Sequence, residues 1–244
     1  MMRGDSFSEL DLREKHIGVE GGMLLAYLVP AMGSLTSLNL SSNQLCGIWT
    51  DWRGEHGTFT TEGITAIADA LRVNGSLTAL DLSSNELKDE GISAVCKAIQ
   101  SNKETKLASL NFGNNGIGPV GANAVAAMVA VTGSLTSLNL AQNQLCGLDK
   151  YGDGTYTAEG ITAFADAMRV NGSLTSIDLS DNNLTDVGSD MTGIKQLAAA
   201  LGVNGSLTSI NLSENNLTNY GRDMTGITEL AAALGVNGSL TKIK

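Results

Sequence analysis

The sequence predicts an α/β fold built as an array of about seven helix–strand units. Three observations predict it: a recurring tetrapeptide, a recurring spacing of leucines and an amphipathic helical pattern between successive leucine blocks. Self-similarity at a period of about 20–50 residues is the signature of a repeat architecture. The tetrapeptide Gly-Ser-Leu-Thr stands at residues 33–36, 75–78, 133–136, 172–175, 205–208 and 238–241.

Each leucine block follows the template L-x-x-L-x-L-x-x-N-x-L, which predicts a short, half-buried strand followed by a turn. In the first copy the template positions are Leu35, Leu38, Leu40, Asn43 and Leu45. Five further full copies begin at Leu77, Leu107, Leu135, Leu174 and Leu207, and a seventh reaches Leu240 and Ile243. Asparagine at the ninth position satisfies backbone groups where the chain turns, so we expect six stacked asparagines to form an internal ladder.

The segments between the strands predict one amphipathic helix per unit. Residues 62–74 place Ile64, Ile67, Ala68 and Leu71 at i, i+3, i+4 and i+7, which is one face of a helix. Equivalent helices are expected to begin near residues 90, 120, 159, 192 and 225, with an earlier one at 22–32. The repeat domain is therefore expected to span residues 20–244, after an N-terminal extension of residues 1–19.

These motifs resemble the leucine-rich repeat superfamily, in its ribonuclease-inhibitor type, over roughly residues 20–244. Similar arrays occur in NOD-like receptors and Ran GTPase-activating proteins. The resemblance implies a curved, horseshoe-shaped solenoid with parallel strands on the concave face and helices on the convex face. It also implies that the chain binds other proteins.

Composition excludes several classes of partner. The formal charge of −10 repels phosphate backbones and anionic membrane surfaces, so nucleic acid is not expected as a partner. The longest apolar run near the start is about ten residues, against about 20 for a spanning helix, so no membrane insertion is expected. Three cysteines without C-x-x-C spacing indicate reduced thiols in an intracellular, cytoplasmic protein, or an organellar one if a transit segment has been removed.

No catalytic, cofactor-binding or metal-binding residues are predicted, and the chain is expected not to be an enzyme. Gly116, Gly118 and Gly121 have the spacing of a dinucleotide turn, but they stand where each unit turns from strand to helix. No acidic residue between Glu104 and Asp149 is available to hold a ribose. The acidic loop at residues 149–153 lacks the further carboxylates of a calcium site, which favours a solvated turn.

The predicted partner-binding site lies in two insertions at matching places, residues 46–61 and 146–157. Both follow a strand, so they are expected to leave the array on one rim. They hold five of the ten aromatic residues, which a repeat core does not need, whereas the outward strand positions are small and polar. With one residue from a smaller insertion at 220–224, the candidate residues are Trp49, Trp52, Arg53, Phe59, Lys150, Tyr151, Tyr156 and Tyr220. The alternative is that these aromatics only fold the loops against each other or cap the neighbouring helices.

The favoured function is a non-enzymatic scaffold that binds a protein partner through this rim. Two alternatives remain. The first is a structural subunit of a larger cytoskeletal, ciliary or organellar assembly, in which a neighbour covers the strand edge of the C-terminal repeat. The second, which rests on the resemblance, is a small-GTPase regulator of the Ran GTPase-activating type, for which Arg53 is the candidate residue.

Overall fold

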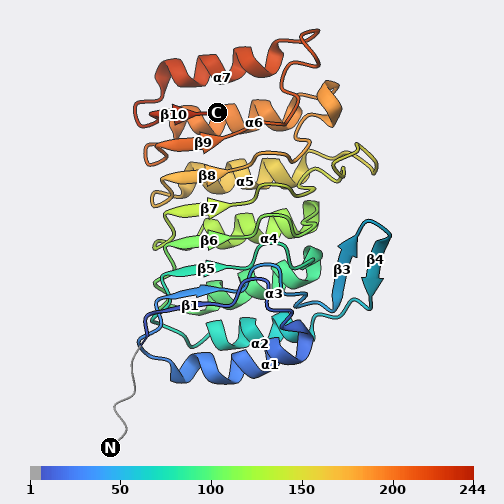
Figure 1. The fold of residues 1–244 in the computed structure, drawn as a ribbon. Coiled ribbons are helices and arrows are strands. Elements are labelled where there is room, and N and C mark those ends of the chain that lie inside the picture. The colour runs from blue at the N-terminus through green and yellow to red at the C-terminus, as the bar shows by residue number, and fades with distance from the viewer. Residues whose placement is uncertain (1–6) are drawn as a thin grey trace, which may run out of the picture.

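The computed structural model describes residues 7–244 as a stack of helix–strand units around one parallel sheet (Figure 1). Eight strands follow one another in the sheet in chain order, and neighbouring strands are parallel. They are β1 (Glu9–Asp11), β2 (Ser37–Asn39), β5 (Ala79–Asp81), β6 (Ser109–Asn111), β7 (Ser137–Asn139), β8 (Ser176–Asp178), β9 (Ser209–Asn211) and β10 (Lys242–Ile243).

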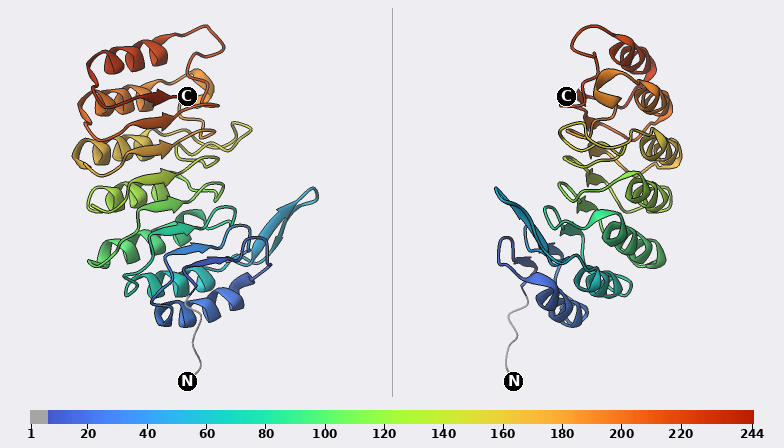
Figure 2. Two further views of the ribbon diagram at one scale, coloured as in Figure 1. Left: turned by 60° about the vertical axis from the view of Figure 1, so that its left-hand side comes forward. Right: turned by 90° about the vertical axis from the view of Figure 1, so that its right-hand side faces the viewer.

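Helices cover only one face of this sheet. Figure 2 shows the stack curving, with the strands on its inner side and the helices on its outer side, as the predicted solenoid requires. The helices are α1 (Gly18–Leu28), α2 (Glu62–Leu71), α3 (Lys88–Ser101), α4 (Pro119–Val129), α5 (Glu159–Val170), α6 (Thr192–Val203) and α7 (Thr225–Val236), with 3-10 turns η1 (Val29–Ala31) and η2 (Asp186–Gly188). No helix between residues 7 and 244 has the length and apolar character needed to cross a membrane.

The core lies between the sheet and the helices. In the sheet, the middle residue of every strand from β2 to β9 is buried, so that Leu38, Leu80 and Leu110 form part of one buried column in register across the sheet. The predicted face of α2 lies against this column, and Ile64 and Leu71 are both buried there. Cys46, Cys96 and Cys146 are buried free thiols in the same core, and burial raises the pKa of Cys46 to about 12.

The asparagine ladder is present, and its hydrogen bonds join neighbouring units. Asn115 shows the pattern: its Nδ2 donates to the carbonyl oxygen of Leu82, one unit earlier, at 3.0 Å. Its Oδ1 accepts from the backbone N–H groups of Asn85 and Leu87, at 3.0 and 3.3 Å. The ladder comprises Asn43, Asn85, Asn115, Asn143, Asn182 and Asn215, each at most 5% exposed.

A second series of asparagines, to which the sequence analysis gave no role, closes the other end of the units. Asn102 follows α3, and its Nδ2 donates to the carbonyl oxygens of Leu71 and Asn74 at 2.7 Å each. Carbonyls at the end of a helix have no partner within the helix, so this side chain satisfies the preceding unit. Asn171, Asn204 and Asn237 make the equivalent bonds.

The array has one more strand than the sequence analysis expected. Strand β1 pairs with β2 and lies inside the stretch that was assigned to an N-terminal extension, residues 1–19. The five template positions are present there as Phe7, Leu10, Leu12, Lys15 and Ile17, with lysine in place of the ladder asparagine. Lys15 has no side-chain amide, yet its backbone N–H still donates to Asn43 Oδ1 at 2.9 Å.

We expect Asn115→Ala to lower the free energy of unfolding by about 3 kcal/mol, because it leaves buried N–H and C=O groups in two units without partners. Urea denaturation measures the effect. Asn139→Ala, on the half-buried strand face, is the matched control and should cost less than about 1.5 kcal/mol, since its Oδ1 accepts a single bond there, from Ala141 N. Equal losses in the two variants would contradict the structural role of the ladder.

Candidate protein-binding site

Both insertions leave the array at the C-terminal ends of their strands, on the right-hand side of Figure 1. We call this edge of the solenoid the insertion rim. The first insertion follows β2 and contains an antiparallel hairpin, β3 (Ile48–Asp51) paired with β4 (Gly54–Gly57). The second follows β7 and is closed by a single antiparallel bridge between Leu148 and Gly154.

The same contacts fix the base of each insertion to the array. Thr60 N donates to Cys46 O at 3.0 Å in the first insertion, and Thr157 N donates to Cys146 O at 2.9 Å in the second. A glycine with positive φ completes each base, because a Cβ on Gly57 or Gly154 would lie within 2.2 Å of a backbone oxygen. The insertions are therefore held in defined positions relative to the sheet.

The hairpin presents its aromatic side chains to solvent. The Trp49 ring stacks on His56, with 5.6 Å between the ring centroids, and His56 Nε2 lies 2.9 Å from Asp51 Oδ1. That hydrogen bond, with one from the backbone N–H of Arg53, holds the pKa of Asp51 below its usual range. At the tip, the Arg53 guanidinium lies 4.4 Å from the centroid of Trp52, whose side chain is 84% exposed.

The second insertion is a tight turn organised by Asp149. Its Oδ1 accepts hydrogen bonds from the backbone N–H groups of Tyr151 and Asp153, at 2.9 Å each, which supports the interpretation of this acidic loop as a turn. The Lys150 ammonium lies 5.0 Å from the centroid of the Tyr151 ring. Tyr151 is 78% exposed.

Two of the eight candidate residues point into the array instead. Phe59 is half-buried against the core, with the Lys88 ammonium 5.2 Å from its ring centroid. Tyr156 also packs against the core, and its hydroxyl donates to the carbonyl oxygen of Leu184 at 3.1 Å. Burial raises the pKa of Tyr156. For these two aromatics, packing of the insertion against the array is the observed arrangement.

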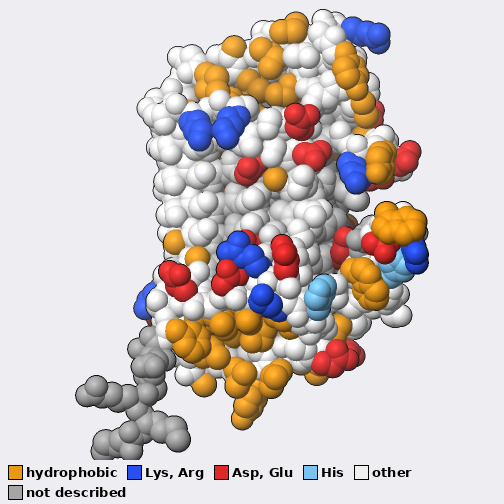
Figure 3. Space-filling model, viewed as in Figure 1, with side chains coloured by type: hydrophobic (Ala, Val, Ile, Leu, Met, Phe, Trp, Pro, Cys, Tyr) orange, Lys and Arg blue, Asp and Glu red, His pale blue; other side chains and the backbone are white. Residues whose placement is uncertain are grey.

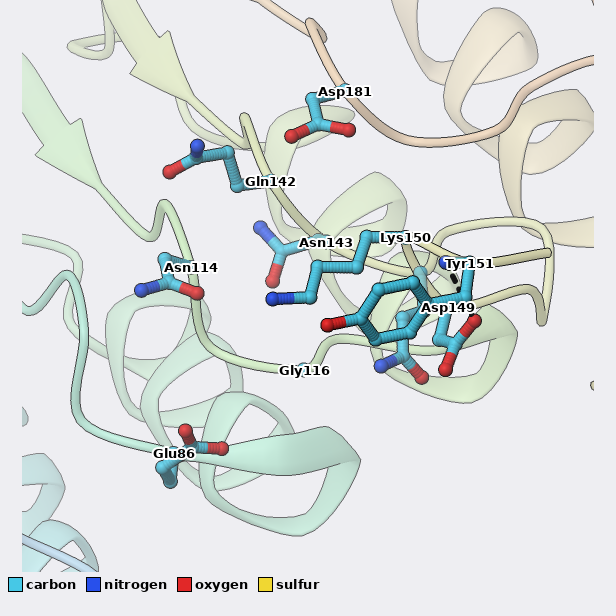
Figure 4. Close-up of a pocket in the computed structure, with 10 residues that line it drawn as sticks. Glu86, Asn114, Gly116, Gln142, Asn143, Asp149, Lys150, Tyr151 and Asp181 are labelled. Carbon is cyan, nitrogen blue, oxygen red and sulfur yellow. Dashed lines mark hydrogen bonds between the residues drawn. The ribbon is translucent and has the colours of Figure 1, made fainter. Parts of the chain in front are cut away.

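A groove lies between the two insertions. It consists of two hollows, of about 380 and 560 Å³, that share Glu86, Asn114 and Lys150 among their lining residues. Trp49 of the hairpin lines one hollow and Tyr151 of the second insertion lines the other. We call the pair the rim groove; Figure 4 shows the hollow beside Tyr151. The remaining candidates, Trp52, Arg53 and the 76% exposed Tyr220, line neither hollow.

The carboxylates that line this groove were not predicted from the sequence. Glu14, Glu86 and Asp181 stand directly before or after the ladder position of their units and have positive φ angles of 53° to 56°. The ladder residue turns into the core, and its neighbours in the left-handed conformation turn outward along the rim. The sequence did hold a signal for them: an alignment of the repeats shows acidic residues at the two positions that flank the ladder residue.

The ladder is interrupted beneath the groove. Asn182 is 1% exposed, and its Oδ1 accepts no hydrogen bond within residues 7–244, whereas Asn215 Oδ1 accepts from Asn182 N and Leu184 N. In the preceding unit, Gln144 lacks the positive φ of its counterparts Gln44, Glu86 and Asn183. Its N–H donates to Ile117 O at 2.8 Å.

The glycines with dinucleotide-like spacing hold a protein carboxylate. Asp89 Oδ1 accepts hydrogen bonds from Gly118 N at 2.7 Å and from Gly121 N at 2.9 Å. These are the backbone donors that a phosphate at the start of α4 would need. Their use by a side chain of the neighbouring unit supports the structural interpretation of this motif.

The inward and outward aromatics should differ in their effect on stability. We expect Tyr156→Ala to lower the free energy of unfolding by about 2 kcal/mol or more, because it removes packed surface and a hydrogen bond. The paired variant Tyr151→Ala, in the same insertion, should change it by less than about 0.5 kcal/mol. Denaturant unfolding monitored by circular dichroism measures both, and a reversed order would show that the described packing of the insertion is wrong.

Comparisons with known proteins agree with the repeat pattern. A family model described as "Leucine Rich repeat" matches residues 73–96, 103–126 and 170–188, and a second, "Leucine Rich Repeat", matches residues 34–53. The comparison with curated proteins found no match.

The comparison with solved structures found matches at low sequence identity, and the first of them shares the fold. The leucine-rich repeat-containing protein LegL7 from Legionella pneumophila is 20% identical, with a TM-score of 0.55, over 97% of this chain and 73% of its own. The C-terminal domain of tropomodulin from Caenorhabditis elegans is 14% identical, with a TM-score of 0.49, over 72% of this chain and 95% of its own. Leiomodin-1 actin-binding site 2 is 18% identical, with a TM-score of 0.44, over 86% and 87% of the respective chains.

The leucine template, the parallel sheet with helices on one face and the family matches agree on one assignment. The chain carries leucine-rich repeats and has the fold of a leucine-rich repeat solenoid.

Proposed function

We propose that this chain is a non-enzymatic scaffold that binds a protein partner at the insertion rim. Leucine-rich repeat domains generally mediate contacts between proteins, and a stacked array offers an extended, rigid surface for them. The observation that carries the proposal is the exposure of Trp49, Trp52 and Tyr151 on two insertions whose bases are fixed to the array. Tryptophan and tyrosine anchors dominate the energy of many protein interfaces.

The fixed positions of the insertions favour binding over loose packing. A loop that is ordered before it meets its partner loses less conformational entropy on binding. The backbone bonds at residues 46 and 146 and the stacked pairs Trp49–His56 and Arg53–Trp52 provide that order. Figure 3 shows the apolar, basic and acidic side chains of the hairpin gathered at the right-hand edge of the molecule.

The concave face of the sheet is a weaker candidate. In Figure 3 this face is mostly free of apolar side chains. Its carboxylates are already used: Asp81 accepts from Ser83 Oγ at 2.7 Å and from Asn111 Nδ2 at 3.0 Å. Asp178 makes the same two contacts, with Ser180 and Asn211. A partner would have to break these bonds and would find no aromatic anchor among the strand residues.

Affinity capture from native lysate, read by mass spectrometry, tests the proposal. We expect the double variant Trp49→Ala, Tyr151→Ala to lose the partners that the wild-type protein captures, because both aromatic walls of the rim groove are removed. The melting temperature should change by only a few degrees, since neither side chain belongs to the buried core.

Tyr27→Ala supplies the matched control. Tyr27 is an aromatic side chain on α1, 82% exposed and outside the insertion rim, so its removal should leave capture unchanged. Capture that survives in the double variant, or that is lost equally in Tyr27→Ala, would contradict binding at the insertion rim.

A further inference from the structure

The lining of the rim groove is strongly acidic. Glu14, Glu86, Asp149 and Asp181 line its two hollows, and Lys150 is the one lysine or arginine among the lining residues. A hollow that adjoins the groove at Glu86 adds Glu55, Asp89 and Glu90, with Lys88 bound to Glu55 at 3.1 Å. Seven acidic side chains therefore lie in or beside the groove that the exposed aromatic side chains border.

Carboxylates in the groove differ from those on the concave face in what they contact. Glu14 and Asp181 make no side-chain hydrogen bond or ion pair within residues 7–244, whereas Asp81 and Asp178 each accept bonds from neighbouring serine and asparagine side chains. A carboxylate without a protein partner is available to a cationic ligand. Two such groups in one concave site attract positive charge more strongly than the same groups would when dispersed.

Lys150 occupies the junction of the two hollows. It lines both of them, and its ammonium forms no ion pair within the described residues. In Figure 4 its side chain extends alongside the Tyr151 ring into the hollow, with Glu86 and Asp181 on opposite sides of it. The free protein thus places one of its own cations against an aromatic ring between carboxylates.

From this geometry we propose that the rim groove binds a basic peptide segment of the partner, and that Lys150 holds the place of a ligand cation until the segment displaces it. The inference rests on the proposed function, since it names the chemistry of the partner at the same rim. Arginine or lysine side chains would pair with Glu14 and Asp181 and lie against Trp49 and Tyr151, which line the same two hollows. The hairpin already makes this kind of contact within the chain, where Arg53 lies over Trp52.

Fluorescence anisotropy with a labelled peptide that alternates Arg and Gly tests the inference, at about 0.15 M salt so that long-range attraction is screened. The double variant Glu14→Gln, Asp181→Asn should bind about tenfold more weakly than wild type. Lys150→Ala should bind severalfold more tightly, because the competing cation is gone. A peptide with Glu in place of Arg should not bind.

Matched controls separate the groove from net charge. Glu104→Gln, Glu229→Gln removes two exposed carboxylates outside the groove and should leave affinity within about twofold of wild type. Asp181→Asn alone is a second variant in case the double variant unfolds, because asparagine accepts the positive φ at this position. Weaker binding by Lys150→Ala, or equal losses in the groove and control variants, would overturn the inference.

The two proposals fail in different ways. If Trp49→Ala, Tyr151→Ala abolishes partner capture but the groove carboxylate variants bind the basic peptide as wild type does, then the rim binds a partner of other chemistry. If the aromatic double variant retains capture, the rim itself is not the binding site.

Discussion

The fold depends on hydrogen bonds that each unit makes with its neighbour through a buried asparagine. A single helix–strand unit has no second layer to bury its apolar face, so its stability comes from the units on either side. The polar backbone depends on neighbouring units in the same way. The Asn85 side chain donates to a backbone carbonyl of the unit before it, and the Asn115 side chain accepts from the backbone N–H of Asn85. The bonds between units link residues 26 to 45 positions apart and keep the strands in one register.

The same constraint creates the surface to which we assign function. Because the ladder residue turns into the core, the residues beside it turn outward in the left-handed conformation, and they do so in successive units. Glu14, Glu86 and Asp181 come to one groove in this way from three units that are far apart in sequence. The two insertions leave the array directly after such turns. Their aromatic side chains form the walls of the groove, and residues of the repeated turns form its floor.

Periodic patterns predicted the fold well, because strand and helix residues follow spacings of 2 and 3.6 in every unit. The strands expected in the blocks that begin at Leu35 and Leu77 are present as β2 and β5, and the helix expected at residues 62–74 is α2, which ends three residues earlier, at Leu71. Strand β1 was missed because lysine replaces asparagine at its ladder position, although its two leucines keep the spacing. Composition placed five aromatics in the insertions but could not distinguish Tyr156, which bonds to Leu184 in the next unit, from the exposed Tyr151. The groove carboxylates also depend on contacts between units, which a single repeat does not reveal.

Hydrogen–deuterium exchange on the protein bound to its captured partner tests the central claim most directly, because it locates the partner on the surface without altering any residue. The account predicts new protection at residues 46–57 and 146–155 and in the groove-lining turns around Glu86 and Asp181. Protection confined to the concave strands β2 to β9 or to the convex helices, with the insertions unchanged, would contradict it.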